Sequence, residues 1–284
     1  MLGHVSVALL ALIDAHPDGA AWARPWLVTT LRANLPGYDD RAGDLSLRGW
    51  SVGAAWGNET LVQSRPIVRN RDVDPIDDLL RTPASCVLAA FYVHSAARDG
   101  LVASAHSPAL SRYRRWLGVR VGPSIPAPRA TALRHALPGF LERHQTDRSD
   151  GELVFLSFLA QLHELDGLRK TYAAPELIRR ALDLTAQRLE LEPPSNLMVS
   201  DGRTFAMTHQ GGALSSFEPP HEGAPARFRV SGQATDGRRT NLLLLTPQAL
   251  EHTPHYQHTP QQGGERVAEG VFSIEARTPR VIER

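Results

Sequence analysis

The stretch GWSVGAAWGNETLVQSRPIV, residues 49–68, predicts a β-hairpin. Two apolar runs flank Gly57 and Asn58, and turn residues placed in this way are a strong hairpin signal. A second hairpin is expected in NLMVSDGRTFAMTH, residues 196–209, where Asp201 and Gly202 suit a tight turn. Hairpins join antiparallel strands, so both ends of the chain are expected to contribute to antiparallel sheets.

Three longer segments with helical spacing of their apolar residues lie between these hairpins. The helices are expected at residues 129–143, 150–165 and 174–191. A shorter helix is expected at 74–81, with Asp74 as its N-cap, and the proline-rich stretch 122–130 is expected to be a surface loop. Further strands are expected at residues 5–13, 86–93, 114–122, 226–232, 239–245 and 270–277. This order of strands, helices and strands favours one α+β domain covering residues 1–284.

The composition is that of an ordinary globular protein, with 42% hydrophobic and 21% charged residues in a chain of 284. A net charge of +1 gives no global attraction to nucleic acid or membranes. The single cysteine, Cys86, excludes an internal disulfide and a multi-cysteine metal site. Because Cys86 lies in an apolar run, we expect a packed and unreactive thiol.

The apolar run Val5–Ile13 allows two interpretations. It is similar to the core of a signal peptide, since small residues follow in AAWA. However, no lysine or arginine precedes the run, and Asp14 closes it as it would close a buried strand. We favour the strand and a cytoplasmic protein. No run approaches the roughly 20 apolar residues of a membrane helix.

The order of the segments resembles that of the class II glutamine amidotransferases, which are N-terminal-nucleophile hydrolases. The similar segments are GWSVGAAW, SRPIV, CVLAAFYVHSAARDG, AHSP, RRWLGVRVG, SDGELVFLSFL, NLMVSDGRTFAMTH and ERVAEGVFSIE. They cover nearly the whole chain, and the closest pattern is the small stand-alone bacterial type. The resemblance implies a four-layer αββα sandwich of two antiparallel sheets with helices outside.

In that family the chemistry starts from a cysteine exposed after removal of the initiator methionine, with its own α-amino group as base. Leu2 stands at this position, and its bulk implies that Met1 is retained. The amide of the oxyanion hole is replaced by Val121, and His94 stands where an arginine would bind the substrate carboxylate. Cys86 cannot take over, because its segment corresponds to a central strand. The resemblance therefore implies that no catalytic residues remain.

The resemblance places five residues in a remnant of the active-site cleft, namely His94, His106, Gly122, Asp150 and Glu152. Asp150 and Glu152 are kept from a motif at a helix start. Two roles remain open for Asp150, since it could contact a ligand or cap the helix.

Two further clusters could bind a ligand. His252, His255 and His258 are spaced three apart and could hold Zn²⁺ or Ni²⁺, although an exposed polar loop is the simpler interpretation. RYRR, residues 112–115, is a basic cluster that could contact phosphate or an acidic protein surface, or form only a solvated rim.

The favoured hypothesis is a degenerate amidotransferase, a pseudoenzyme without cofactor or metal. It would act by binding an unidentified protein partner, or a small ligand in the remnant cleft, and not nucleic acid or a membrane. One alternative is an active amidotransferase or amidohydrolase with a relocated nucleophile. The other is a metal-binding protein that uses the histidines of residues 252–258.

Overall fold

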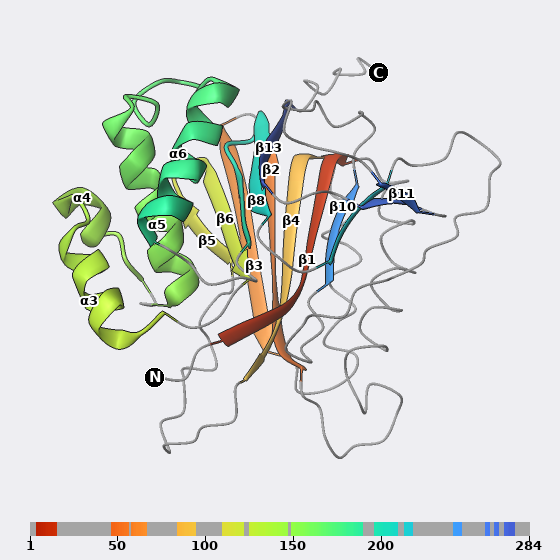
Figure 1. Ribbon diagram of the computed structural model, residues 1–284, viewed down its shortest axis with the longest axis horizontal. Coiled ribbons are helices and arrows are strands. Elements are labelled where there is room, and N and C mark those ends of the chain that lie inside the picture. Colours follow the sequence, from red (N-terminus) through yellow and green to blue (C-terminus); the bar gives the residue numbers. More distant parts are fainter. Residues whose placement is uncertain are drawn as a thin grey trace.

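A computed structural model shows an α+β protein with two β-sheets and a group of helices (Figure 1). The structure describes residues 4–15, 47–56, 58–66, 84–94, 110–121, 125–146, 149–189, 196–209, 213–217, 241–245, 259–261, 264–266 and 270–275. The helix expected at 74–81 and the strand expected at 226–232 lie outside these residues.

The larger sheet contains strands from both ends of the chain, in the order β11-β12-β9-β10-β1-β4-β2-β3. Most of its strand pairs are antiparallel. The pairs β1–β10 and β10–β9 run parallel, whereas an all-antiparallel sheet was expected. Its strands are β1 (His4–Ala15), β2 (Leu47–Trp56), β3 (Glu59–Pro66), β4 (Ala84–His94), β9 (Ala213–Phe217), β10 (Asn241–Leu245), β11 (Thr259–Gln261) and β12 (Gly264–Arg266). The strand expected at residues 5–13 is confirmed as β1.

The smaller sheet is antiparallel throughout, in the order β13-β8-β7-β6-β5. Its strands are β5 (Leu110–Tyr113), β6 (Trp116–Val121), β7 (Asn196–Ser200), β8 (Thr204–His209) and β13 (Gly270–Glu275).

Both predicted hairpins are confirmed. In the β2–β3 hairpin Trp56 pairs with Glu59, which leaves a two-residue turn. In the β7–β8 hairpin the amide of Asp201 donates to the carbonyl of Thr204, so the turn centres on Gly202 and its neighbour. The φ of 84° at Gly202 is a left-handed conformation that favours glycine.

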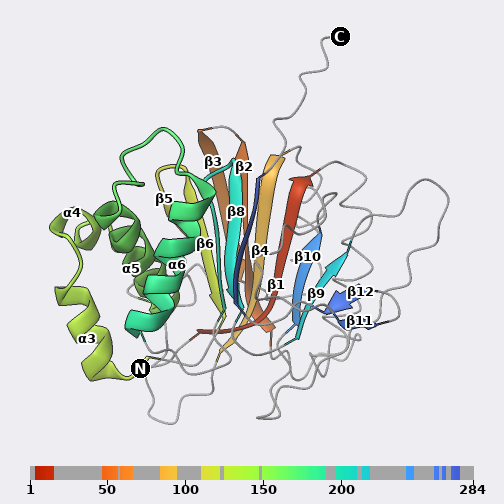
Figure 2. The same ribbon diagram turned by 45° about the horizontal axis from the view of Figure 1, so that its top comes forward.

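The helices lie together beside the smaller sheet (Figures 1 and 2). They are α3 (Ala127–His135), α4 (Gly139–Glu142), α5 (Asp150–Glu164) and α6 (Pro175–Leu189). Helix α5 approaches β6 so closely that a Cβ atom on Gly118 would lie 2.1 Å from the ring of Phe155. On the other face of the smaller sheet, the side chain of Leu110 packs closely against Gly53 of β2. A Cβ atom added to Gly53 would lie 3.0 Å from it. The described residues thus form one helical layer and two stacked sheets of the expected four-layer sandwich.

Two helix predictions are confirmed and one is wrong. The segments expected at 150–165 and 174–191 form α5 and α6. The segment expected as one helix at 129–143 is two helices, because Pro138 has no amide hydrogen for a continuous helix and instead precedes α4. The loop expected at 122–130 also ends early, since α3 already begins at Ala127. Pro128 is tolerated in its first turn, where amide hydrogens have no helical partner.

The sequence prediction also missed four strands, namely β5, β9, β11 and β12. Residues 114–122 were expected as a single strand, but Arg114 and Arg115 form the turn of a β5–β6 hairpin. Arg114 has a φ of 52°, a conformation that usually calls for glycine or asparagine, and neither residue is present to mark the turn.

The core lies between α5, α6 and the two sheets. Its largest fully buried side chains are Trp50, Trp116, Phe155, Phe158 and Phe205. Within the part of the chain described, no helix is long and apolar enough to cross a bilayer.

Candidate functional site

The strand register places His94, one of the residues predicted for the remnant cleft, at one end of the larger sheet. His4, at the start of β1, pairs with His94 at the end of β4. The β2–β3 turn, next to Trp56, lies at the opposite end of the same sheet. The two ends can therefore be considered as separate candidate sites.

Most of the predicted cleft residues lie at the first end or outside the described residues. Leu2, His106 and Gly122 are not among the described residues. For His94 and Val121 the structure describes only the backbone, which pairs with His4 and Asn196 respectively. The roles proposed for these residues stay predictions.

Asp150 begins α5 but does not cap it. The N-cap is Ser149, whose hydroxyl oxygen accepts a hydrogen bond of 3.1 Å from the amide of Glu152. Asp150 Oδ2 instead accepts a 2.8 Å hydrogen bond from the amide of Ile125, in the chain segment that enters α3. The carboxylate thus links two helix starts.

Beneath this helix start lies Arg120, a buried cation that the sequence analysis did not single out. Arg120 is only 7% exposed and stands on β6. Burial lowers the pKa of its guanidinium from its ordinary value to about 10, and the negative charge of Asp150 acts in the opposite direction. An arginine in the middle of an otherwise apolar strand is the sequence signal that could have identified it.

Glu152 is also engaged in local structure. It is 5% exposed, and its Oε1 accepts hydrogen bonds of 2.8 Å from both the amide and the hydroxyl of Thr146. A buried carboxylate held by such donors stabilises the approach to α5. Asp150 and Glu152 therefore both have structural partners.

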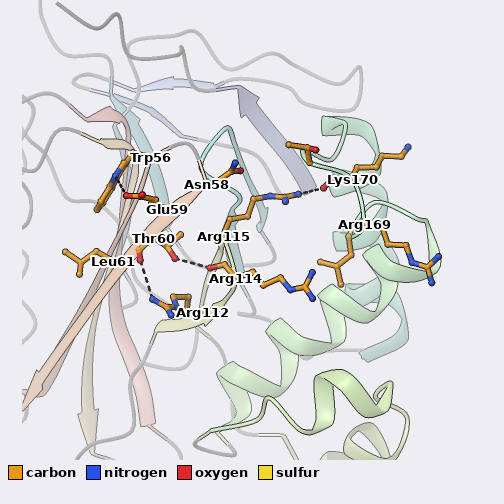
Figure 3. A pocket seen from close by; sticks show the side chains of 12 residues that line it. Trp56, Asn58, Glu59, Thr60, Leu61, Arg112, Arg114, Arg115, Arg169 and Lys170 are labelled. Atoms are coloured by element: carbon orange, nitrogen blue, oxygen red, sulfur yellow. Dashed lines mark hydrogen bonds between the residues drawn. The ribbon is translucent and has the colours of Figure 1, made fainter.

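The opposite end of the sandwich carries an open cleft with a volume of about 830 Å³ (Figure 3). We call it the basic cleft, because five of its lining side chains are basic and only one is acidic. It is lined by Trp56, Asn58, Glu59, Thr60, Leu61, Arg112, Arg114, Arg115, Leu168, Arg169, Lys170 and Thr171. The cluster RYRR that was noted in the sequence provides three of these basic residues. Arg169 and Lys170 were missed, since only the fold brings the α5–α6 connection beside the two hairpins.

The side chain of Arg115 contacts several of the elements around the basic cleft. Its Nη2 donates a 2.7 Å hydrogen bond to the carbonyl of Lys170, and its guanidinium lies over the rings of Trp116 and Tyr172. Its Nε lies 3.9 Å from Oδ2 of the fully buried Asp201. This arrangement ties the β5–β6 turn to the α5–α6 connection and to the β7–β8 turn.

Two hydrogen bonds connect the sheets at the edge of the basic cleft (Figure 3). Arg112 Nη1 donates to the carbonyl of Thr60 at 3.3 Å, and the hydroxyl of Thr60 donates to the carbonyl of Arg114 at 3.0 Å. Arg114 itself is exposed and stacks over the ring of Tyr113. The charge at its tip is therefore available to a ligand.

Apolar surface accompanies this charge. Leu61 is 44% exposed, and it is the one large hydrophobic residue exposed to this extent among those described. Trp56 is partly exposed beside it, with its indole nitrogen donating to Glu59 Oε2 at 3.1 Å. The cleft can therefore offer both cationic and apolar contacts to a ligand.

The candidates for redox and metal chemistry are the thiol of Cys86 and the clusters of ligating side chains. Cys86 is 1% exposed in the middle of the larger sheet, where it pairs with Ile13 and Ala55. No group of three or more metal-ligating side chains occurs in the described ranges. His252, His255 and His258 fall outside those ranges, so the metal prediction is not tested.

No protein-family model and no curated protein matches this sequence. Solved structures do resemble it at low identity. A glutamine aminotransferase class-II domain protein from Silicibacter pomeroyi is 12% identical with a TM-score of 0.40, over 81% of this chain and 91% of that one. A predicted glutamine amidotransferase from Pseudomonas aeruginosa is 10% identical with a TM-score of 0.37, over 86% and 82%.

A glutamine phosphoribosylpyrophosphate amidotransferase from B. subtilis, solved with ADP and GMP, is 12% identical with a TM-score of 0.34. That match covers 58% of this chain and 31% of the larger enzyme. The chain is thus structurally similar to class II glutamine amidotransferase domains, at low sequence identity.

Proposed function

We propose that this protein binds an acidic segment of a partner protein in the basic cleft and does not hydrolyse glutamine. The observation that carries the proposal is the charge of the cleft, in which Glu59 is the one acid among five basic lining residues. Like charges gathered on one surface attract a partner of opposite sign, and they do so most strongly at low ionic strength.

The shape and the apolar surface of the cleft favour a protein over a small anion. The cleft is open, and its basic side chains come from the β5–β6 hairpin and the α5–α6 connection instead of converging on one point. Trp56 and Leu61 add contact area of the kind that protein interfaces use, where tryptophan and arginine contribute much of the binding energy. The net charge of +1 for the whole chain argues against a long polyanion such as nucleic acid.

The absence of glutaminase activity is proposed on separate grounds. The position that the resemblance assigns to the oxyanion amide holds Val121, which has no side-chain amide to donate. The one thiol of the chain, on Cys86, is sealed in the larger sheet and could attack a substrate only after the sheet opened. These features support a binding role for the scaffold.

The binding proposal is tested with a fluorescein-labelled 12-residue peptide of alternating glutamate and leucine, measured by fluorescence anisotropy at two salt concentrations. We expect saturable binding that weakens with salt. Reversing two charges, in Arg112→Glu/Arg169→Glu, should weaken binding at least tenfold. The control Arg143→Glu, at the exposed C-cap of α4, should change the affinity by less than twofold. Equal affinities of the two variants, or no binding at all, would refute the proposal.

The catalytic part of the proposal is tested by ammonia release from glutamine. We expect no release above background with the purified protein. Release that disappears when the protein is unfolded by heat would show that an active site exists, and would favour the relocated nucleophile over the binding role.

A further inference from the structure

The strand β3 lies at the edge of the larger sheet, next to the basic cleft. Its one partner among the described strands is β2. In an antiparallel pair, alternate residues direct their amide and carbonyl groups toward the partner or away from it. Because Trp56 and Glu59 flank a two-residue turn, they form a pair bonded to each other, and the pattern alternates from there. Thr60, Val62 and Ser64 therefore direct their backbone groups outward.

Two contacts agree with this alternation. The outward carbonyl of Thr60 is the group that accepts the hydrogen bond from Arg112. The hydroxyls of Ser51 and Ser64 lie 2.8 Å apart, as expected for a pair that is not hydrogen-bonded through its backbone and has closely spaced side chains.

The strand β5 lies at the edge of the smaller sheet. At the same end of the sandwich, one of its outward backbone groups has a hydrogen-bond partner. By the same counting from the Arg114–Arg115 turn, Arg112 directs its carbonyl outward, and this oxygen lies 3.3 Å from Nε2 of His144. On β3, the contacts among the described residues include no such hydrogen bond beyond Thr60. No described element bonds to the outward backbone groups of Val62 or Ser64, and the strand ends at Pro66, which has no amide hydrogen to offer.

We infer that the acidic partner segment binds as an added strand along the outer edge of β3, at Val62 and Ser64, with its carboxylates in the basic cleft. This inference rests on the proposed function and specifies how that binding occurs. The amide and carbonyl groups of Val62 and Ser64 supply the backbone hydrogen bonds, as in other complexes formed by strand addition. The exposed Leu61 lies on the outer face of β3 and contacts an apolar side chain of the added strand.

The geometry also orients the segment. The basic cleft lies at the start of β3, beside Glu59 and Thr60. An added strand pairs preferentially in the antiparallel direction, in which its carboxyl-terminal end lies beside the start of β3. The acidic residues of the partner segment therefore follow its strand-forming residues in sequence.

The test uses peptides with the sequence order just described, four alternating threonine and leucine residues followed by four glutamates. Each backbone nitrogen of the first four residues is methylated in turn, and binding is measured by anisotropy. Strand addition predicts a period of two, in which methylation at alternate residues weakens binding about tenfold and methylation between them changes it by less than threefold. A reversed peptide, with glutamates first, should bind more weakly.

Amide hydrogen exchange of the protein gives a second readout. The amides of Val62 and Ser64 should exchange more slowly when the unmethylated peptide is bound, whereas those of exposed residues on α4 should not change. Binding that is lost in Arg112→Glu/Arg169→Glu, but shows no period of two and no protection of Val62, would overturn strand addition and leave the acidic partner in place. Failure of every acidic peptide to bind would overturn both.

Discussion

Several charged side chains of this protein are buried and are held by named partners. Arg120 lies under the start of α5 near Asp150, and Asp201 lies under the β7–β8 turn near Arg115. Burying either charge is unfavourable in free energy, because a charge taken out of water must be compensated by hydrogen bonds or an opposite charge. The compensation differs between the two residues, so substitutions at each have different consequences.

The lowered pKa of Arg120 predicts a dependence of stability on alkaline pH. Below about pH 10 both the folded and the unfolded chain hold this proton, and the cost of the buried charge is constant. Above about pH 10, and up to the ordinary pKa of a solvated guanidinium, the folded state binds fewer protons than the unfolded state, so the free energy of unfolding rises with pH. Relative to Arg120→Met, the native protein should gain about 1 kcal/mol between pH 9 and pH 11.

Urea unfolding of both proteins at the two pH values checks this difference, with Arg143→Met as the exposed control. A difference between native protein and Arg120→Met that stays constant over this range would show that burial does not disfavour the charged guanidinium.

For Asp201 the expected effect is a loss of stability at neutral pH. Its Oδ1 accepts hydrogen bonds from the amides of Arg203 and Thr204, at 3.0 and 2.8 Å, and these organise the turn. Asp201→Ala should lower the free energy of unfolding by about 2 kcal/mol, since it leaves buried amides without an acceptor. Chemical denaturation measures the loss. Asp183→Ala, at an exposed position on α6, should have almost no effect, and a similar loss there would contradict this account.

At the scale of elements, the close contact of α5 with the smaller sheet determines where the helices lie. Gly118 lets the ring of Phe155 reach the backbone of β6, and Phe155 is fully buried there. The neighbouring α3 and α4 are separated by Pro138, so the long helices on the sheet, among those described, are α5 and α6. The packing of this layer therefore depends on a glycine in a strand, where glycine is otherwise unfavourable.

Gly118→Ala should consequently destabilise the protein by about 2 kcal/mol, because its Cβ atom would overlap the ring of Phe155. Gly139→Ala is the matched control: nothing lies within 4 Å of the added atom, and alanine suits a helix better than glycine. Thermal unfolding should show a lower melting temperature for the first variant only. Adding Phe155→Leu to Gly118→Ala should recover part of the loss, and no recovery would mean that the strain lies elsewhere.

At the scale of the whole molecule, the fold separates the chain's one thiol from solvent. Cys86 lies between Ile13 and Ala55 in the larger sheet, and its neighbours in β4 are fully buried. No local movement of a side chain would expose it, since β1 and β2 flank the position on both sides. The thiol therefore reports on the opening of the sheet as a unit.

We expect Cys86 to be unreactive toward a disulfide reagent in the folded protein and to react at once in denaturant. Labelling of the folded protein requires the sheet to open, so the labelling rate should be higher in Gly118→Ala. The increase should match the factor by which this substitution raises the equilibrium constant for unfolding. Rapid labelling under native conditions would show that the thiol is accessible, and would reopen the question of a relocated nucleophile.

The sequence by itself determined the α+β class, the β2–β3 and β7–β8 hairpins and the helices α5 and α6. Turn residues and helical spacing are local signals, and they were sufficient at these places. Local signals failed at Arg114, which forms a turn without glycine, and at Pro138, which divides a segment of otherwise helical spacing.

Only the tertiary structure decided what surrounds the charged residues. RYRR was visible as a basic cluster, but Arg169 and Lys170 join it because a helix connection folds back onto two hairpin turns. In the same way Asp150 looked like a helix cap or a ligand contact, whereas the fold gives the cap to Ser149 and brings Ile125 to the carboxylate. Such contacts join residues far apart in the chain, and their geometry is set by packing between layers, which no local pattern of residues encodes.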